Sequence, residues 1–288
     1  MSDRRQSKGG ETEPSAAAPS VWWLVLKQEL IELWLGQRVL NLLILFSVLM
    51  SITALLVATN NEVQLLPLSE TVLVALTAAI TFGLFNGLII SAESITGERE
   101  RATLEALLLT PASRQHIILG KFLAALSLWP VTLLLSIPYI AVLSRSEPVL
   151  GQALFWGAIV GSLLAVAFTG FGMLLSMWSS SSRISLAVSL LAYVFALVPA
   201  QLPSEFQVTP LGVLVATTNP LEASRQFLKR TLVESQPLGE VWFYLAAPII
   251  FIALLLGVLL LYAAPRLSLE GGRAGMNWRI WRPAEEIK

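Results

Sequence analysis

Residues 149–178 read VLGQALFWGAIVGSLLAVAFTGFGMLLSMW and contain no charged side chain. A helix crosses the hydrocarbon core of a bilayer in about 20 mostly apolar residues. Because lipid offers the backbone no hydrogen-bonding partner, a helix is favoured there, since it satisfies its own N–H and C=O groups. These residues therefore predict a transmembrane helix.

The composition of the whole chain agrees with a membrane protein. Of its 288 residues, 55% are hydrophobic and only 13% are charged, whereas a soluble domain carries about 25% charged residues. Nineteen basic and nineteen acidic residues give no net charge, which argues against nucleic acid as a partner. The chain has no cysteine, which excludes disulfides and thiolate chemistry, and its single histidine, His116, excludes a His-rich metal site.

Six stretches are long and apolar enough to cross a bilayer. They cover approximately residues 39–59, 71–92, 117–143, 149–178, 184–201 and 241–264. In the third stretch, Pro130 and Pro138 are the expected kink points. The sequence thus predicts an all-α integral membrane protein with one six-span transmembrane domain over residues 21–264.

The distribution of Lys and Arg predicts the orientation of the spans. Fifteen of these residues fall on the side of the two termini and four on the other side. Positive residues accumulate on the cytoplasmic side of membrane proteins, so both termini are expected in the cytosol and the protein in the cytoplasmic (inner) membrane. Residues 1–20 lack the apolar core of a signal peptide and are expected to form a disordered cytosolic tail. Residues 265–288 are expected to form a second cytosolic tail.

An amphipathic helix is expected before the first span, over residues 21–37. Its apolar arc would hold Trp22, Trp23, Leu26, Leu30, Leu33 and Trp34, and its polar arc Lys27, Gln28, Glu29 and Glu32. A Trp-rich helix of this kind is typical of the membrane interface. The alternative is a simple extension of the first span.

A long segment on the outer side, residues 202–240, precedes the last span. Within it, the apolar residues 208–217 are too few to cross and are interpreted as a re-entrant or surface half-helix. The sequence Asn219-Pro220-Leu221-Glu222 has the residue types of a helix start. We expect the helix that follows to lie across the outer mouth of the membrane domain. Its apolar side would hold Leu221, Phe227, Leu228 and Leu232.

Small residues recur every four positions in the fourth span. They are Ala153, Gly157, Gly161, Ala165 and Thr169. Such a stripe lets another helix approach closely. Packing within one subunit is the favoured interpretation, and a subunit interface is the alternative.

The connection between the second and third spans, residues 93–121, reads ESITGERERATLEALLLTPASRQHIILGK. Each of its charges would cost about 2.5–3.5 kcal/mol at the bilayer centre, so it must leave the lipid. Gly97 permits a break, Pro111 stops a helix, and Ser113 can cap the third span. The pattern predicts one short amphipathic helix, with a solvated loop as the alternative. Its apolar face would hold Leu104, Leu107 and Leu108, and its polar face Glu98, Arg101 and Glu105.

The order of residues in this connection closely resembles the signature of the type-2 ABC exporter permeases. The resemblance is carried by Glu98, Arg99, Glu100, Arg101, Thr103, Leu104, Glu105, Leu107, Leu108 and Pro111, and then by Gly120-Lys121. In that family the segment is a coupling helix that docks on a separate ATP-binding subunit, so the resemblance implies that the ten residues from Glu98 to Pro111 couple the chain to an ATPase. The family pattern usually has Gly where this chain has Ala102. Because Ala favours a helix by about 1 kcal/mol over Gly, we expect a stiffer helix.

The resemblance implies a permease subunit that couples ATP hydrolysis by a partner to transmembrane export. The expected partners are an ABC ATP-binding subunit, a second permease copy or paralogue, and the lipid bilayer, with no nucleic acid. Six spans are half of a transport pathway in this family. The charge-poor spans suit a lipid, a hydrophobic drug or a peptide, or the transmission of force without a soluble substrate.

ATP hydrolysis by this chain itself is not expected. A phosphate-binding loop ends in Gly-Lys-Ser/Thr, but Gly120-Lys121 is followed by Phe122 and lacks the upstream glycine. We therefore predict no catalytic, cofactor-binding or metal-binding residue in this chain, and ATP and Mg in the partner ATPase.

Two other classes of membrane protein stay open, an autonomous polytopic membrane enzyme (intramembrane hydrolase) and a channel. A hydrolase of this kind needs a histidine deep in the spans, but His116 is expected at the cytosolic boundary. Ion-coupled carriers place charged residues inside the membrane, whereas Lys121 is expected to snorkel to the interface. Asn41, Asn86 and Gln152 are interpreted as interhelical hydrogen-bonding groups rather than a substrate site.

Overall fold

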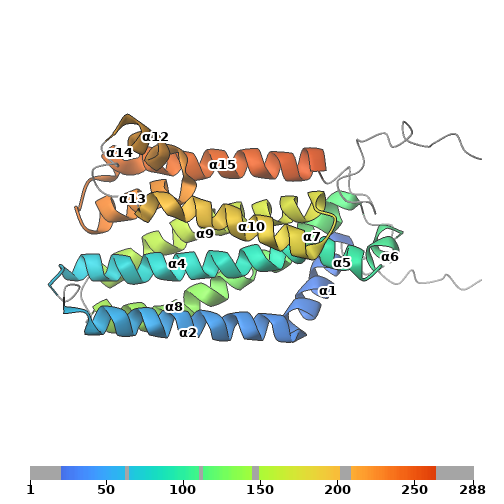
Figure 1. Cartoon of the computed structure of the whole chain (residues 1–288), viewed down its shortest axis with the longest axis horizontal. Helices are drawn as coiled ribbons and strands as arrows, with labels where there is room; N and C mark the ends of the chain where they lie inside the picture. Colours follow the sequence, from blue (N-terminus) through green and yellow to red (C-terminus); the bar gives the residue numbers. More distant parts are fainter. Residues whose placement is uncertain (1–20, 62–64, 110–112, 145–148, 202–208, 264–288) are drawn as a thin grey trace, which may run out of the picture.

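The structure is a computed structural model, and it describes residues 21–61, 65–109, 113–144, 149–201 and 209–263. All regular elements among these residues are helices, and the spans run side by side along the long axis of the molecule (Figure 1). The predicted tails, residues 1–20 and 265–288, and the predicted site residue Pro111 lie outside the described residues.

Six helical segments of the described chain are long and apolar enough to cross a membrane. They are Gln37–Thr59, Leu68–Glu100, Arg114–Ser144, Val149–Trp178, Ser182–Gln201 and Leu238–Leu261. The predicted all-α, six-span fold is thus confirmed. The longest helices of four spans are α2 (Gln37–Thr59), α4 (Leu68–Glu93), α9 (Val149–Trp178) and α10 (Ser182–Leu197), the last continued by the 3₁₀ turn η1 (Val198–Gln201).

The third span is divided into α7 (Arg114–Leu126) and α8 (Leu128–Ser144). The break falls at Ser127, three residues before Pro130. Proline has no N–H to donate to the carbonyl four residues earlier, here that of Leu126, so the helix is weakened at this point. The kink expected near Pro130 is therefore confirmed, whereas α8 continues through Pro138.

The last span changes helical type along its length. It comprises α14 (Leu238–Val241), the 3₁₀ turn η2 (Trp242–Leu245), α15 (Ala246–Gly257) and the π-helical η3 (Val258–Ala263). The side-chain amide of Gln115 on α7 donates to the carbonyl of Leu260 in η3, with 3.2 Å between the two atoms. This contact links the end of the last span to the third.

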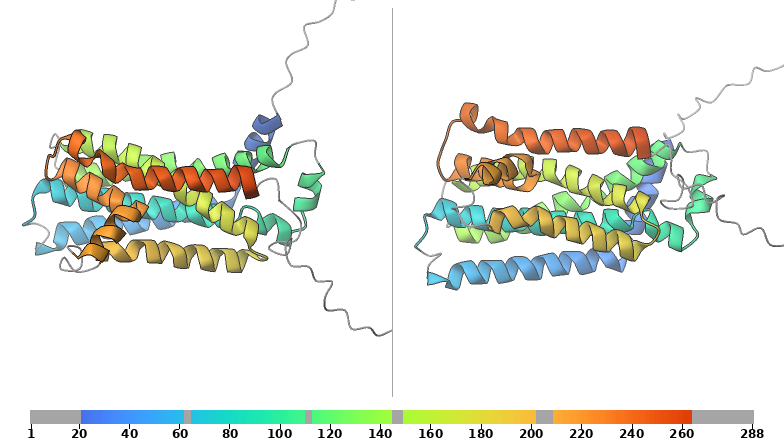
Figure 2. Two further views of the ribbon diagram at one scale, coloured as in Figure 1. Left: turned by 90° about the horizontal axis from the view of Figure 1, so that it is seen from above. Right: turned by 45° about the horizontal axis from the view of Figure 1, so that its top comes forward.

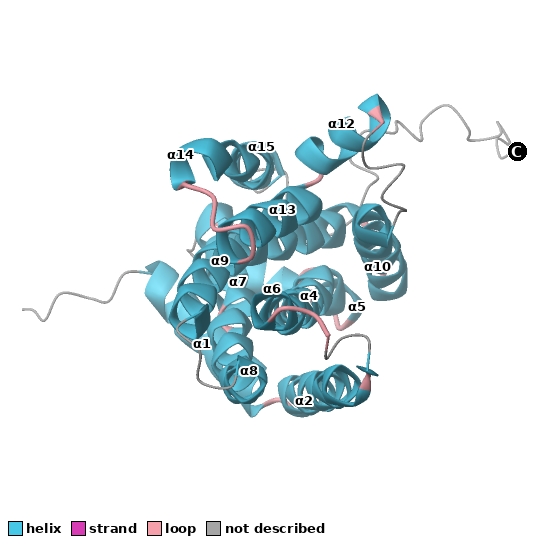
Figure 3. Ribbon diagram, turned by 90° about the vertical axis from the view of Figure 1, so that its left-hand side faces the viewer, coloured by secondary structure: helices cyan, strands magenta, loops and turns pink. Residues whose placement is uncertain are grey.

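The core of the bundle is built on the packing of α9 against α4. The stripe of small residues on α9 is buried, and a Cβ placed on Gly157 would lie 2.4 Å from Leu76 of α4. A Cβ on Gly161 would lie 2.2 Å from the ring of Trp129, whose indole N–H donates to Ser162 at 2.9 Å. The stripe therefore packs against helices of the same subunit, which is the interpretation that the sequence favoured. Viewed along the bundle (Figure 3), α4 lies among α2, α8, α9 and α10.

Polar side chains inside the bundle join neighbouring helices. The amide of Asn86 on α4 donates to the carbonyl of Leu42 on α2 at 3.4 Å, so the interhelical role predicted for Asn86 is confirmed. The hydroxyl of Tyr193 on α10 donates to the carbonyl of Thr81 on α4 at 2.6 Å.

The amino-terminal helix α1 (Val21–Leu35) is separate from the first span. Gly36 adopts an extended conformation between α1 and α2, so α1 is not an extension of α2. Figures 1 and 2 place α1 at the end of the bundle that also carries α5 (Thr96–Glu100) and α6 (Leu104–Leu108). Trp22 and Trp23 are exposed, and a position in the membrane interface stays a prediction.

The opposite end of the bundle carries α12 (Pro210–Thr218) and α13 (Pro220–Leu232). The side-chain oxygen of Asn219 accepts from the backbone N–H groups of Leu221 at 2.9 Å and Glu222 at 3.3 Å, so the predicted helix start is confirmed. From the predicted apolar side of α13, Phe227, Leu228 and Leu232 enter the core shared with α4 and α9, and Leu221 packs against it half-buried. Helix α13 is thus part of the bundle core as well as of the end opposite α1.

Candidate coupling site

The coupling segment, defined here as residues 94–109, forms two short helices instead of the one predicted. Helix α5 ends at Glu100 and α6 begins at Leu104. Between them Ala102 has a φ of 58°, in the left-handed region. This corrects the expectation of a stiffer continuous helix, because Ala102 occupies the turn itself. An L-residue other than glycine adopts this conformation at a cost of about 1–2 kcal/mol, which explains why Gly suits this position in the family pattern.

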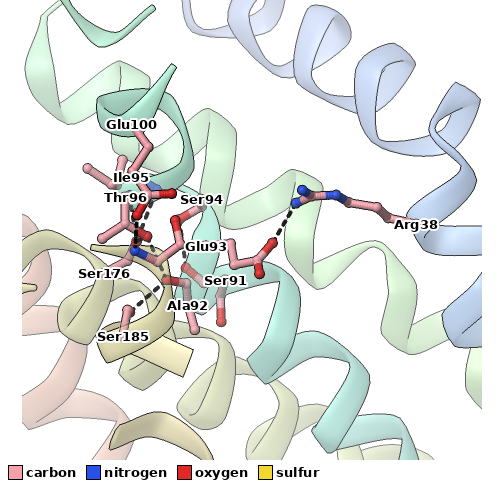
Figure 4. Close-up of polar contacts among 11 residues, drawn as sticks. Arg38, Ser91, Ala92, Glu93, Ser94, Ile95, Thr96, Glu100, Ser176 and Ser185 are labelled. Carbon is pink, nitrogen blue, oxygen red and sulfur yellow. Dashed lines mark hydrogen bonds and ion pairs between the residues drawn. The ribbon is translucent and has the colours of Figure 1, made fainter. Parts of the chain in front are cut away.

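The break that precedes the coupling segment also lies earlier than predicted. Helix α4 ends at Glu93, and Ser94 and Ile95 form the turn, while Gly97 lies inside α5. The turn is held by Ser176 of α9, whose hydroxyl accepts from the N–H groups of Ile95 at 3.1 Å and Thr96 at 3.0 Å (Figure 4). Buried polar groups need hydrogen-bonding partners, and the hydroxyl of Ser176 is the acceptor for both backbone N–H groups.

A second serine fixes the same turn from α10. The hydroxyl of Ser185 donates to the carbonyl of Ala92 at 2.7 Å (Figure 4). Neither Ser176 nor Ser185 is among the site residues predicted from the sequence. The sequence signal for each is a serine within an apolar span. This signal is weak because many such serines only bond to their own helix.

Arg99 and Glu100 are turned toward the connection between α9 and α10. The guanidinium of Arg99 donates to the carbonyl of Ser179 at 2.6 Å. The carboxylate of Glu100 accepts from the N–H of Ser182, the first residue of α10, at 2.7 Å. An acidic group at a helix start is favoured by the helix dipole. These two predicted site residues therefore attach α5 to the rest of the bundle.

Leu104 anchors the coupling segment in an apolar cluster. It is 1% exposed, whereas Leu107 and Leu108 are half-buried. The cluster draws side chains from α7, α9 and the last span. Its buried members are Ile95, Leu104, Ile118, Phe122, Met173, Leu174, Met177, Leu255, Leu259 and Ala263. A displacement of Leu104 must therefore displace three spans or open a void.

Glu98 points into the protein and forms an ion pair with Lys121 of α7. The Lys121 ammonium also contacts a carboxylate oxygen of Glu29 on α1 at 2.6 Å. The Lys121 side chain is 3% exposed, so the expectation that it snorkels to the interface is wrong. Two carboxylates offset the desolvation of its charge, and α1 covers it.

The tip of the segment presents the remaining predicted residues to solvent. Arg101, Thr103 and Glu105 are exposed. Leu109, which the sequence analysis did not single out, is 81% exposed. The run of three leucines at 107–109 could have indicated it, because a single amphipathic turn does not bury three consecutive side chains. The structure thus divides the coupling segment into two parts. The root, made of Glu98, Arg99, Glu100 and Leu104, is anchored in the bundle, and the tip, made of Arg101, Thr103, Glu105 and Leu109, is exposed.

A cleft of about 380 Å³ opens beside the root, between α1, α2, α4, α5 and α7. Glu29, Glu98 and Lys121 line it on one side, and the ion pair of Arg38 with Glu93 lines it on another (Figure 4). Among the described residues, no three His, Cys, Asp or Glu side chains are grouped so that they could hold a metal ion.

A second buried ion cluster lies at the opposite end, within α13. Glu222 is 3% exposed, and its carboxylate accepts from Arg225 at 2.9 and 2.7 Å and from Gln226 at 2.8 Å. All three residues belong to one stretch of helix. The sequence analysis did not predict that this acidic residue is buried.

Comparison with known families identifies the family of the chain. The sequence model of the ABC-2 family transporter proteins matches residues 23–264. This chain belongs to the ABC-2 family. It is therefore a multi-pass membrane permease of the ABC transporters, and the resemblance carried by residues 98–121 is confirmed. A comparison of the permease with curated proteins finds no match.

Proposed function

We propose that this permease is the membrane subunit of an ATP-driven exporter and couples ATP hydrolysis by a separate ABC subunit to transport. The observation that carries the proposal is the division of the coupling segment. Its root is held by α7, α9, α10 and the last span, and its tip is exposed. A partner bound to the tip can therefore move the spans through the root. Membership of the family supports the proposal, since it implies an ABC ATP-binding partner in general.

The proposed docking surface is the tip, made of Arg101, Thr103, Glu105 and Leu109. Exposed charges of both signs would steer and orient the partner, and an exposed leucine among them suits an apolar pocket on it. Arg99, Glu100 and Leu104 would transmit the motion rather than contact the ATPase. Thr110 and Pro111 follow the tip in the sequence, and Pro111 keeps its predicted role in ATPase coupling.

The proposed assembly contains two permeases, identical or paralogous, and two ATPase subunits that bind ATP and Mg. We propose that the end with α1, α5 and α6 faces the cytosol in the cytoplasmic membrane. The excess of Lys and Arg on this side supports that orientation. Closure of the ATPase dimer would then displace both coupling segments and re-orient the spans.

The first test is co-purification. Tagged permease is isolated from gently solubilised native membranes, and its partners are identified by sequencing. The proposal expects a soluble subunit with a phosphate-binding loop, at one copy per permease. A permease that purifies alone, under conditions that preserve known complexes, would contradict the proposal and favour a channel or an autonomous membrane enzyme.

The second test is a charge reversal at the tip, Arg101→Glu combined with Glu105→Lys. Misplaced charges at an interface oppose binding strongly, so we expect the yield of co-purified ATPase to fall at least about tenfold. Lys229→Glu, at an exposed position of α13 on the opposite end, is the matched control and is expected to leave the yield unchanged. Normal co-purification by the tip variant would remove this surface from the proposal.

A further inference from the structure

We infer that Lys121 is a positioning residue that links the coupling segment to α1, so that the two move as one body. This inference rests on the proposed function and adds a second route from the ATPase to the spans. The first route runs through the apolar cluster of Leu104. The second runs through the Lys121 cluster, defined as Lys121 with Glu29 and Glu98.

The geometry of the Lys121 cluster supports this role. One ammonium group on α7 contacts a carboxylate of α1 and a carboxylate of α5. The three residues are far apart in the sequence, since Lys121 is separated from Glu29 by 92 in residue number and from Glu98 by 23. Loss of one partner from a buried ion cluster leaves an uncompensated charge. The carboxylates and the ammonium therefore stay together when any one of the three elements moves.

The cleft beside the cluster makes this link significant. About 380 Å³ of space lies among α1, the end of α4 and α5, so side-chain packing does not fill the region between them. Without Lys121, the root of the coupling segment could shift into this space while α1 stayed in place. With Lys121, a displacement of Glu98 is passed to Glu29.

Helix α1 is tied to the third span at two further points besides the ion pair of Glu29 with Lys121. A Cβ placed on Gly120 would lie 2.8 Å from the Val25 side chain and 3.3 Å from the backbone N of Leu26, so the two helices are in close contact there. The indole N–H of Trp34 donates to the hydroxyl of Ser127 at 3.0 Å. Ser127 marks the break between α7 and α8. Motion of α1 therefore reaches the weakest point of the third span.

The deciding experiment removes the link but keeps the fold. In the triple variant Lys121→Met, Glu29→Gln and Glu98→Gln, no charge is left unpaired, and replacing a complete buried ion cluster is often neutral for stability. We expect normal co-purification of the ATPase, because the tip is intact. We expect the ATPase activity of the whole complex, stimulated by the permease, to fall about tenfold, a typical size for the loss of a coupling between sites.

Hydrogen exchange of the same complexes measures the link directly. In the wild type, trapping with ATP is expected to change the exchange of residues 21–35 and 96–108 together. In the triple variant, exchange in 96–108 is expected to rise about tenfold and to respond to ATP without a change in 21–35. The inference would be overturned if the triple variant had the same ATPase activity and the same hydrogen exchange as the wild type. It would also be overturned if residues 21–35 and 96–108 of the wild type responded to ATP independently of each other.

The matched control neutralises the other ion pair of the cleft, with Arg38→Gln and Glu93→Gln. This pair is partly exposed and joins α2 and α4, which already pack against each other. The ATPase activity and the hydrogen exchange of the complex with this control variant are expected to equal those of the wild type. If no ATPase co-purifies at all, the proposed function fails. The exchange of the isolated permease still tests the link, because it requires no nucleotide to compare the triple variant with the wild type.

Discussion

Each end of the bundle buries an ion cluster, and these two clusters are built differently. At the end with the coupling segment, Lys121 joins carboxylates from two other elements. At the opposite end, Glu222 pairs with Arg225 three residues along the same helix. The first cluster holds separate parts of the chain together, and the second satisfies a charge locally.

The difference indicates where relative motion is expected. A local pair such as Glu222 and Arg225 moves with its own helix and does not connect that helix to its neighbours. Helix α13 is also capped by Asn219 and held in the core by Phe227, so we expect it to move as one rigid element. A pair that bridges elements resists their separation, and the fold uses one where α1 and the coupling segment meet.

The largest effect on stability is expected from the single substitution Lys121→Met. It leaves the carboxylates of Glu29 and Glu98 close together without a cation, and breaking a buried cluster in this way costs about 3–5 kcal/mol. Unfolding of the purified permease in detergent measures the loss. Recovery of most of the stability in the triple neutral variant is the control, and a loss below about 1 kcal/mol for Lys121→Met would contradict the comparison.

The next largest effect is expected at the root of the coupling segment. Leu104→Ala removes a buried side chain from a cluster shared by three spans, which costs about 2–5 kcal/mol. Leu109→Ala, at the exposed tip, should change the free energy of unfolding by less than about 0.5 kcal/mol and weaken co-purification of the ATPase instead. Equal destabilisation by the two variants would show that root and tip are not distinct.

A smaller effect is expected from Glu222→Gln. The substitution leaves Arg225 without its partner, but that side chain is 27% exposed and can be hydrated. We therefore expect a loss of about 1 kcal/mol, as for a polar contact whose partner remains accessible to water. Thermal unfolding of Glu222→Gln and Lys121→Met side by side tests this. A larger loss at Glu222 would reverse the comparison of the two ends.

The smallest effect is expected at the turn between α5 and α6. Ala102→Gly relieves the left-handed strain, worth about 1–2 kcal/mol, and adds freedom to the unfolded chain, which costs about 0.4–1 kcal/mol. The net result is a stabilisation of about 0–1.6 kcal/mol, with a midpoint near 0.8 kcal/mol, measured by unfolding. Ala102→Val is the control, because a β-branched residue is disfavoured at this φ and should destabilise. A loss of stability with glycine would contradict the assigned turn.

Local sequence patterns determined the membrane architecture of this protein. The six spans follow from the length of apolar stretches that carry almost no charge. The starts of α13 and α7 follow from Asn219 and Ser113, which each cap the next turn. These features depend on residues within a few positions of each other, so composition and spacing are sufficient to predict them. The order of residues from Glu98 to Lys121 also indicated the family.

The tertiary structure decided how the coupling segment is divided. Ala102 is a good helix former, yet it takes a left-handed turn because Ser176 holds the start of the segment and the apolar cluster holds Leu104. Lys121 is buried instead of snorkelling because Glu29 and Glu98 reach it from distant parts of the chain. Both outcomes depend on contacts between residues far apart in the sequence, and local propensity contains no information about such contacts.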